Sequence, residues 1–354
     1  MTSIVPAPKS DNDLRPASEP KVAVVMPAFN GERYVEDAIE SVRAQTFAGW
    51  ELVVVDDGSR DRTADIVRWR AREDSRIRLI QHTNAGQGRT RNVGISASAA
   101  PWIGFIDQDD LWEPHKLERQ LRIVEEGQAD VAFSDARLFG PRAPRFRLGT
   151  PVGRFDGAAM HALLIPRNRI PILSSLVSRA LLARVGYIEE SLTFQNCDDY
   201  DLWLRLADAG ASFVGTDECL VQYRMHSEQA SKNTIPMLTA ELAVIHRHAG
   251  CPGVDRATLV DRYQQLYRDL SDQLVAVRDF VQLNLRTAEC RRVISGWSPL
   301  FPWEEPLAAV APFLYPPVRR VARRACVSAR YRVIDPLRRL GAAVSSAARS
   351  RLRQ

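Results

Sequence analysis

Short runs of consecutive apolar residues alternate, in the first third of the chain, with segments whose apolar residues recur every three or four positions. Residues 22–26 and 52–55 are runs of the first kind, which are typical of strands buried on both faces. Residues 35–42 are of the second kind and predict an amphipathic helix. The alternation continues with strands at 77–80 and 102–106. The pattern therefore predicts an α/β fold in which a mostly parallel central sheet is flanked by helices.

The pattern changes in the second half of the chain. Short apolar runs at 213–215 and 220–223 indicate edge strands, and residues 237 to about 294 have helical spacing with no strands between. No apolar run is long enough to span a bilayer. We predict a disordered leader at 1–20, an α/β domain at 21–232, a helical extension at 233–296, and a linker with a basic tail at 297–354.

Carboxylates directly follow two of the predicted strands. Asp56 closes the second strand, and Asp107, Asp109 and Asp110 crowd into four positions after the strand at 102–106. Ligands bind outside the carboxyl ends of parallel strands, so we expect these residues to share one cleft. Crowded carboxylates raise one another's pKa unless a cation is shared, and their oxygens suit Mg²⁺ or Mn²⁺. The cluster predicts a metal–diphosphate site in which Asp110 caps the next helix; a solvated acidic turn is the alternative.

A second acidic pair, Asp198 and Asp199, runs directly into a segment with helical spacing. Both would lie at the positive end of that helix, where carboxylates are stabilised. The alternative for either residue is an ordinary N-cap.

The five cysteines are scattered along the chain and form no Cys-x-x-Cys pair. This usage indicates a reducing compartment and argues against a zinc site. Five of the six histidines are interpreted as surface or structural residues: His82, His115, His161, His246 and His248.

The net charge of +5 conceals an uneven distribution. From Pro316 onward there are eleven arginines and one acid, Asp335, so this tail carries +10 and the rest of the chain −5. Arginine pairs alternate there with apolar positions at helical spacing, which favours contact with an anionic membrane surface. Few aromatic residues are available to stack on bases and no nucleic-acid motif is present, so we expect no nucleic-acid partner. A merely solvated basic tail is the alternative.

Five motifs, in order, resemble those of the family 2 glycosyltransferases, inverting enzymes with a GT-A fold. The resemblance covers residues 21–231 approximately. The processive synthases of that family carry membrane helices and a Gln-x-x-Arg-Trp motif, and this sequence has neither, so the resemblance implies transfer of a single sugar. The matching segments are Val22 to Asn30, Val53 to Ser59, Asn84 to Gly86 with Arg91 to Gly94, Asp107 to Asp110, and Asp199 to Leu206.

The resemblance implies a role for each matched position. Asp199 would be the general base, and Asp198 would contact the acceptor, although Asp stands here where the family has Glu. Asp109 and His226 would hold a divalent metal, Mn²⁺ or Mg²⁺. The nucleotide-binding residues would be Pro27, Phe29, Asp56, Arg78 and Asp107.

Together these features predict a cytoplasmic enzyme, peripheral on the inner face of the cell membrane. It would move one sugar from a nucleotide-sugar donor, by family tendency a UDP-sugar, to a glycan or lipid-linked acceptor in surface polysaccharide biosynthesis. An inactive nucleotide-sugar-binding scaffold is the alternative. A nicotinamide-dependent dehydrogenase is disfavoured because the first turn lacks Gly-x-Gly-x-x-Gly. The oligomeric state is left open.

Overall fold

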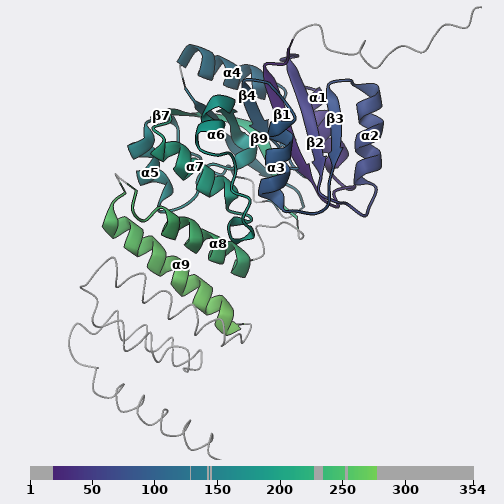
Figure 1. Ribbon diagram of the computed structural model, residues 1–354. Helices are drawn as coiled ribbons and strands as arrows, with labels where there is room; N and C mark the ends of the chain where they lie inside the picture. Colours follow the sequence, from purple (N-terminus) through teal and green to yellow (C-terminus); the bar gives the residue numbers. More distant parts are fainter. Residues whose placement is uncertain are drawn as a thin grey trace, which may run out of the picture. The chain divides into compact units, whose positions relative to one another are not determined.

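The computed structural model describes residues 19–127, 129–141, 143, 146–226, 234–251 and 254–276. Its centre is a nine-stranded sheet in the order β3-β2-β1-β4-β8-β6-β9-β5, with β7 paired to β9 (Figure 1). The predicted fold class is confirmed. The strands are β1 (Val22–Ala28), β2 (Trp50–Asp56), β3 (Ile77–Gln81), β4 (Trp102–Phe105), β5 (Leu111–Trp112), β6 (Val131–Phe139), β7 (Gly153–Phe155), β8 (Ser175–Ser178) and β9 (Phe213–Arg224).

The first four strands form a parallel half-sheet that is covered on both faces. Val24 and Leu52 face the core formed with α1, α2 and α4. Val25 and Val55 face α3 on the other side, where a Cβ on Gly94 would lie 2.5 Å from Val25. Two covered faces explain the continuous apolar runs in β1 and in residues 52–55 of β2, whereas the edge strand β3 also carries polar residues. The helices here are α1 (Val35–Arg43), α2 (Thr63–Glu73), α3 (Gln87–Ser96) and α4 (Lys116–Gly127).

The second half of the sheet is mixed, and one prediction for it was wrong. The segments at 213–215 and 220–223 belong to one long strand, β9, which lies between β6 and β5 and is not an edge strand. The two segments are joined through polar residues 217 and 218, where the β6–β9 register shifts, so these residues form a bulge and the strand continues.

Two of the remaining helices, at Gly157–Leu164 and Arg179–Arg184, begin with a side-chain N-cap. Asp156 caps α5 by accepting a hydrogen bond from the Ala159 N–H, and Ser178 caps α6 in the same way with Leu181. A Cβ on Gly157 would lie 2.2 Å from the Ala207 carbonyl oxygen, so α5 and α7 approach closely. The helices are α5 (Gly157–Leu164), α6 (Arg179–Arg184), α7 (Asp198–Asp208), α8 (Thr234–Arg247) and α9 (Arg256–Ala276), with 3₁₀ turns at Ile172–Ser174 and Leu192–Phe194.

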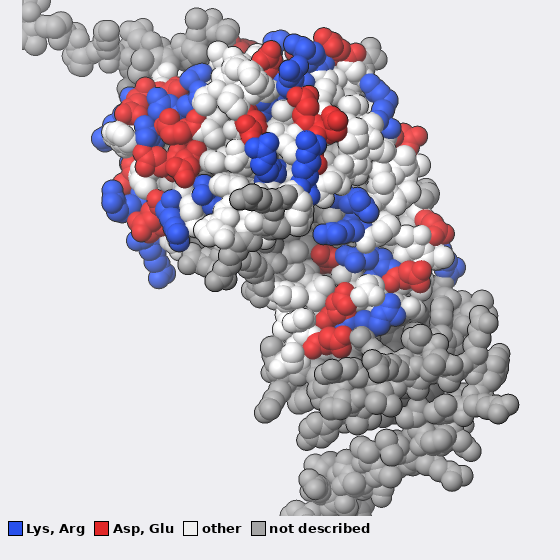
Figure 2. Space-filling view, turned by 180° about the vertical axis from the view of Figure 1, so that it is seen from behind, with Lys and Arg blue, Asp and Glu red and all other residues white. Residues whose placement is uncertain are grey.

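The chain divides into two compact units, Met1–Arg262 and Tyr263–Gln354. The predicted leader, apart from residues 19 and 20, and the linker with its basic tail lie outside the described residues, so the predicted domain boundaries stay predictions. Among the described helices none is both long and apolar enough to cross a membrane. On the face seen in Figure 2, basic and acidic side chains are interspersed. Ion pairs also join α1 to α2, where Arg70 pairs with Glu36, Glu40 and Glu73.

Candidate active site

Three loops meet at the carboxyl end of the parallel strands. The Phe29 N–H donates to Gln108 Oε1 at 2.9 Å, and Gln108 Nε2 donates to the Phe29 carbonyl at 3.0 Å. The Asn30 N–H donates to Ser59 Oγ at 2.8 Å. The loops after β1, β2 and β4 are therefore joined by direct hydrogen bonds. The structure brings together the acidic and turn segments that the sequence placed in one shared site.

The residues predicted to bind the nucleotide base differ in how accessible they are. Phe29 is 45% exposed, whereas Asp56 is fully buried. Asp56 accepts hydrogen bonds from the Ser59 N–H at 3.1 Å and from Gln81 Nε2 at 2.9 Å. Pro27 is buried within β1. Phe29 thus offers an open apolar surface, while Asp56 supports the turn beneath it.

Asp109 and His226, the two predicted metal ligands, lie in direct contact although 117 positions separate them. His226 Nε2 is 2.7 Å from Asp109 Oδ2, and both side chains are mostly buried. Burial and the neighbouring Asp107 carboxylate raise the pKa of Asp109, and His226 opposes this shift. Carboxylate oxygen and imidazole nitrogen are suitable ligands for Mn²⁺. These two residues fit a divalent metal that carries water and phosphate oxygens as its other ligands.

Asp110 is not a helix cap, which corrects the prediction. Its side chain is 1% exposed and accepts a hydrogen bond from the Arg224 N–H of β9 at 2.7 Å. The next helix begins six positions later, at Lys116. Burial and the carboxylates of Asp109 and Asp107 raise the pKa of Asp110 well above its usual range. Asp110 therefore ties the acidic turn to β9, close to His226.

The first turn of α7 holds Asp198 and Asp199, and neither is its N-cap, because that position is Cys197. Asp199 Oδ1 accepts from the Tyr200 N–H at 2.7 Å and from Asn168 Nδ2 at 3.3 Å. Burial and the adjacent Asp198 carboxylate raise the pKa of Asp199 to about 7. A carboxyl group with this pKa can take up a proton near neutral pH.

Arg91 connects the acidic turn to α7 and was not assigned a role from the sequence. Its guanidinium contacts Asp107 Oδ1 at 2.8 Å and Asp198 Oδ2 at 2.5 Å, and its side chain is 3% exposed. Burial alone would lower the pKa of Arg91, but the Asp198 and Asp107 carboxylates outweigh burial and raise it. Asp198 is itself buried. The Arg91-Asn92 motif was the available signal, but the sequence does not reveal which carboxylates it meets.

Arg78 lies apart from the rest of the predicted site. Its guanidinium contacts Glu51 Oε2 at 2.7 Å and donates to the Ala97 carbonyl at 2.7 Å. Arg78 pairs in register with Val53 in β2, three residues before Asp56. These contacts do not support the nucleotide-binding role predicted for Arg78.

A mixed sheet with a carboxylate turn at the end of its parallel half is the arrangement of the GT-A glycosyltransferase fold, and this chain has that fold. Two solved structures share the fold. S. aureus TarS 1-349, in complex with UDP-GlcNAc, superposes with a TM-score of 0.57 at 18% identity, over 70% of this chain and 72% of that chain. The mannosyltransferase PcManGT from Pyrobaculum calidifontis, in complex with GDP-Man and Mn²⁺, gives 0.54 at 15% identity, over 95% and 88%.

Sequence comparison confirms the family for one part of the chain. Residues 23–169 match the model of glycosyl transferase family 2, the family that the motifs of the sequence resemble. It is 29% identical over 216 residues, 61% of this chain and 83% of the relative, to TuaG of Bacillus subtilis strain 168, whose name assigns it provisionally to teichuronic acid biosynthesis. It is also 29% identical, over 63% of this chain and 85% of the relative, to an Escherichia coli enzyme. That enzyme is the UDP-Glc:alpha-D-GlcNAc-diphosphoundecaprenol beta-1,3-glucosyltransferase WfgD.

Proposed function

We propose that this glycosyltransferase moves one sugar, with inversion, from a nucleoside-diphosphate sugar to a hydroxyl of a glycan or lipid-linked acceptor in surface polysaccharide biosynthesis. The names of TuaG and WfgD support this acceptor class, and the ligands of TarS and PcManGT support the donor class. A UDP-sugar is the expected donor, because UDP-sugars appear with both WfgD and TarS.

The state of Asp199 is the observation that carries the proposal. With a pKa of about 7, a substantial fraction of the Asp199 side chain is ionised at neutral pH, and this carboxylate is basic enough to accept a proton. Among the described residues, the Tyr200 N–H and the Asn168 amide donate hydrogen bonds to Asp199, and neither is a cation. Asp199 would take the proton of the acceptor hydroxyl as that oxygen attacks the anomeric carbon from the face opposite the leaving diphosphate.

Asp109 and His226 would hold Mn²⁺ or Mg²⁺ on the donor side. A bound cation would act as a Lewis acid toward the departing diphosphate. Asp107, held by Arg91, lies in the same turn and would orient toward the ribose or a metal-bound water. Phe29 would pack on the base, next to Pro27 and Asp56. The acceptor contact predicted for Asp198 stays a prediction, since this side chain is buried against Arg91.

A donor screen tests the proposal and separates it from an inactive scaffold. The full chain is mixed with Mn²⁺ and UDP-, GDP- or dTDP-sugars, and thermal stabilisation identifies the donor. Transfer is then measured with that donor and a lipid-linked acceptor. Asp199→Asn should abolish transfer and leave donor stabilisation nearly intact. Equal loss of both would contradict the base assignment, and donor binding without transfer by the wild type would favour the scaffold.

The membrane location is a separate proposal, supported by the charge of residues 316–354. Eleven arginines there would bind anionic lipid. Sedimentation with liposomes that contain anionic lipid should pull down the full chain but not a chain truncated at Pro316. Unchanged binding after truncation would refute the role of the tail.

A further inference from the structure

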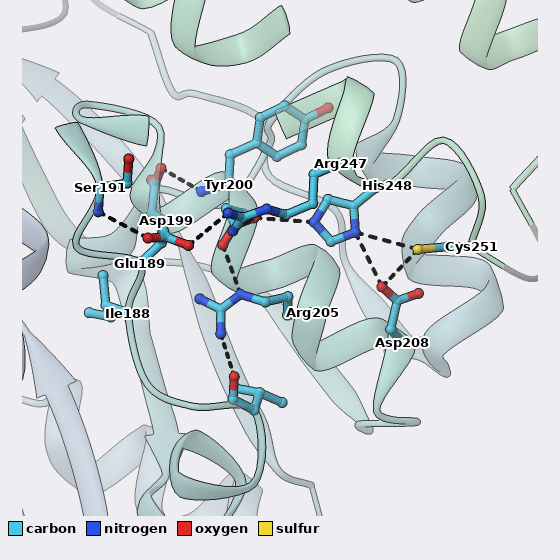
Figure 3. Close-up of polar contacts among 12 residues, drawn as sticks. Ile188, Glu189, Ser191, Asp199, Tyr200, Arg205, Asp208, Arg247, His248 and Cys251 are labelled. Carbon is cyan, nitrogen blue, oxygen red and sulfur yellow. Dashed lines mark hydrogen bonds and ion pairs between the residues drawn. The ribbon is translucent and has the colours of Figure 1, made fainter. Parts of the chain in front are cut away.

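A second group of potential metal ligands lies away from the acidic turn, at the far end of α7. Asp208 is the last residue of α7, and His248 and Cys251 follow the end of α8. We call these three residues the Asp208 cluster. Figure 3 shows their side chains pointing toward one another. Their three potential ligand atoms lie within 4.8 Å of one another, so these residues could hold one metal ion.

The separations within the Asp208 cluster match a tetrahedral site. Cys251 Sγ lies 3.1 Å from Asp208 Oδ2 and 3.6 Å from His248 Nδ1, and His248 Nδ1 lies 3.2 Å from Asp208 Oδ2. Zinc bonds of about 2.0–2.3 Å at tetrahedral angles separate ligand atoms by about 3.3–3.6 Å. One ion could therefore contact all three atoms after shifts of a few tenths of an ångström.

Two further residues stand where the outer partners of metal ligands are found. His248 Nε2, the ring nitrogen turned away from the cluster, is 3.3 Å from Asp201 Oδ1. His161 Nε2 is 2.7 Å from Asp208 Oδ1, the oxygen that Cys251 does not contact. His161 is 2% exposed, and neither of its ring nitrogens is aligned for a hydrogen bond within the described residues. Metal-ligating histidines commonly donate their other N–H to a carboxylate, and ligating carboxylates also have outer partners.

The donor set distinguishes this site from the acidic turn. A thiolate and an imidazole prefer zinc, whereas the oxygen-rich turn at Asp109 suits Mg²⁺ or Mn²⁺. The sequence argued against zinc because it has no Cys-x-x-Cys pair. The local signal is instead a His-x-x-Cys pair, His248 to Cys251, which the fold completes with Asp208.

We propose that Asp208, His248 and Cys251 bind one Zn²⁺ ion, with a solvent molecule in the fourth position on the side where Asp208 is partly exposed. The ion would fasten the segment after α8 to the end of α7, the helix whose first turn carries Asp199. Asp201 would hold the His248 ring in its ligating orientation. Without a metal, the same atoms would form only a thiol–carboxylate–imidazole hydrogen-bond network, and the two cases can be separated by experiment.

The first test measures metal content and the thiolate bond. The full chain, freed of any histidine tag and purified from zinc-supplemented cells, should contain about one zinc per chain. After exchange into Co²⁺ it should show a sulfur-to-cobalt charge-transfer band in the near ultraviolet. Cys251→Ser and Asp208→Asn should lose the zinc and the band. Cys219→Ser removes a thiol elsewhere in the described chain and should keep both, as should Asp109→Ala.

A second test needs no variant and remains valid if a substitution prevents folding. Zinc bound to the Asp208 cluster should slow alkylation of Cys251 in the wild-type chain at least about 10-fold, and a chelator should reverse the protection. Mg²⁺ should give no protection. The proposal is overturned if the wild type holds no zinc after supplementation, if Cys251→Ser keeps the cobalt band, or if zinc leaves the alkylation rate unchanged.

Discussion

Replacing Arg91 by methionine tests whether the acidic turn and α7 are held together by one buried charge. The guanidinium lies between Asp107 Oδ1 and Asp198 Oδ2, and Arg91 and Asp198 are both nearly inaccessible. Methionine keeps an unbranched apolar stem but supplies no positive charge. Two carboxylates would then face each other without a counter-ion, one of them in the interior.

The expected destabilisation is large because a buried charge would lose its partner. Breaking a buried ion pair by removing one side costs about 3–5 kcal/mol. For a domain of this size about 1 kcal/mol corresponds to about 2–4 °C, so the Tm should fall by about 6–20 °C. Arg91 also lowers the pKa of Asp199. Its loss should raise that pKa further and move the acid limb of the pH–rate profile to higher pH.

Differential scanning fluorimetry and the pH dependence of kcat measure the two effects. Arg78→Met is the matched control, since Arg78 is 45% exposed in its pair with Glu51, and pairs of this kind contribute about 1 kcal/mol or less. In an Asp198→Asn chain, Arg91→Met should lower the Tm by less, because only the Asp107 carboxylate then loses its counter-ion. An Arg91→Met chain with the Tm and acid limb of the wild type would refute the reasoning.

Three further predictions concern the same domain. Asp199→Asn should reduce kcat by at least about 100-fold. The pKa of Asp199 is about 7 in the folded chain and 3.8 ordinarily, so its ionisation lowers the stability of the fold as the pH rises from 3.8 to about 7. At about pH 8, Asp199→Asn should therefore raise the unfolding free energy by up to about 4 kcal/mol and raise the Tm with it. An unchanged or lower Tm would contradict the raised pKa. Asp109→Ala should remove the dependence of transfer on Mn²⁺ concentration together with most of the activity, and a normal Mn²⁺ titration would exclude Asp109 as a ligand. Gly88→Ala should destabilise by about 1–3 kcal/mol in urea unfolding, since its Cβ would lie 2.1 Å from the Glu189 carbonyl oxygen. Gly250→Ala is the control, because a Cβ at Gly250 would have no atom within 4 Å. Equal loss of stability in the two variants would refute the close approach of Gly88 to Glu189.

The parallel half of the sheet could be predicted because its signal is local. Strands covered on both faces are apolar at nearly every position, and the sequence shows this directly for β1 and for residues 52–55 of β2. The turns after them could be placed because strand ends of one direction share one edge. β9 was missed as a single strand because its bulge carries polar residues, and a bulge is defined only by the partner strand.

The candidate site was predictable in its residue types and less so in their partners. Local patterns suggested a cap for Asp110, whose hydrogen-bond donor lies 114 positions away in β9. Arg91 stood in a recognisable motif, but its two carboxylates come from a different turn and from α7. The Asp208 cluster draws on two segments 40 or more positions apart. Contacts at such separations depend on the packing of whole elements, which periodicity does not encode.

The first turn of α7 shows how packing separates one carboxylate from its neighbours. Asp198, Asp199 and Asp201 lie within four positions, yet Arg91 pairs with Asp198, and Arg205 and Arg247 pair with Asp201. Burial would raise the pKa of Asp201, but His248 and the arginines lower it, so this group stays ionised. Within the described residues Asp199 accepts hydrogen bonds from two neutral donors, and burial next to the Asp198 carboxylate raises its pKa to about 7 although Arg91 opposes the shift. A first turn with three acids therefore presents one base, and the positions of the arginines decide which acid it is.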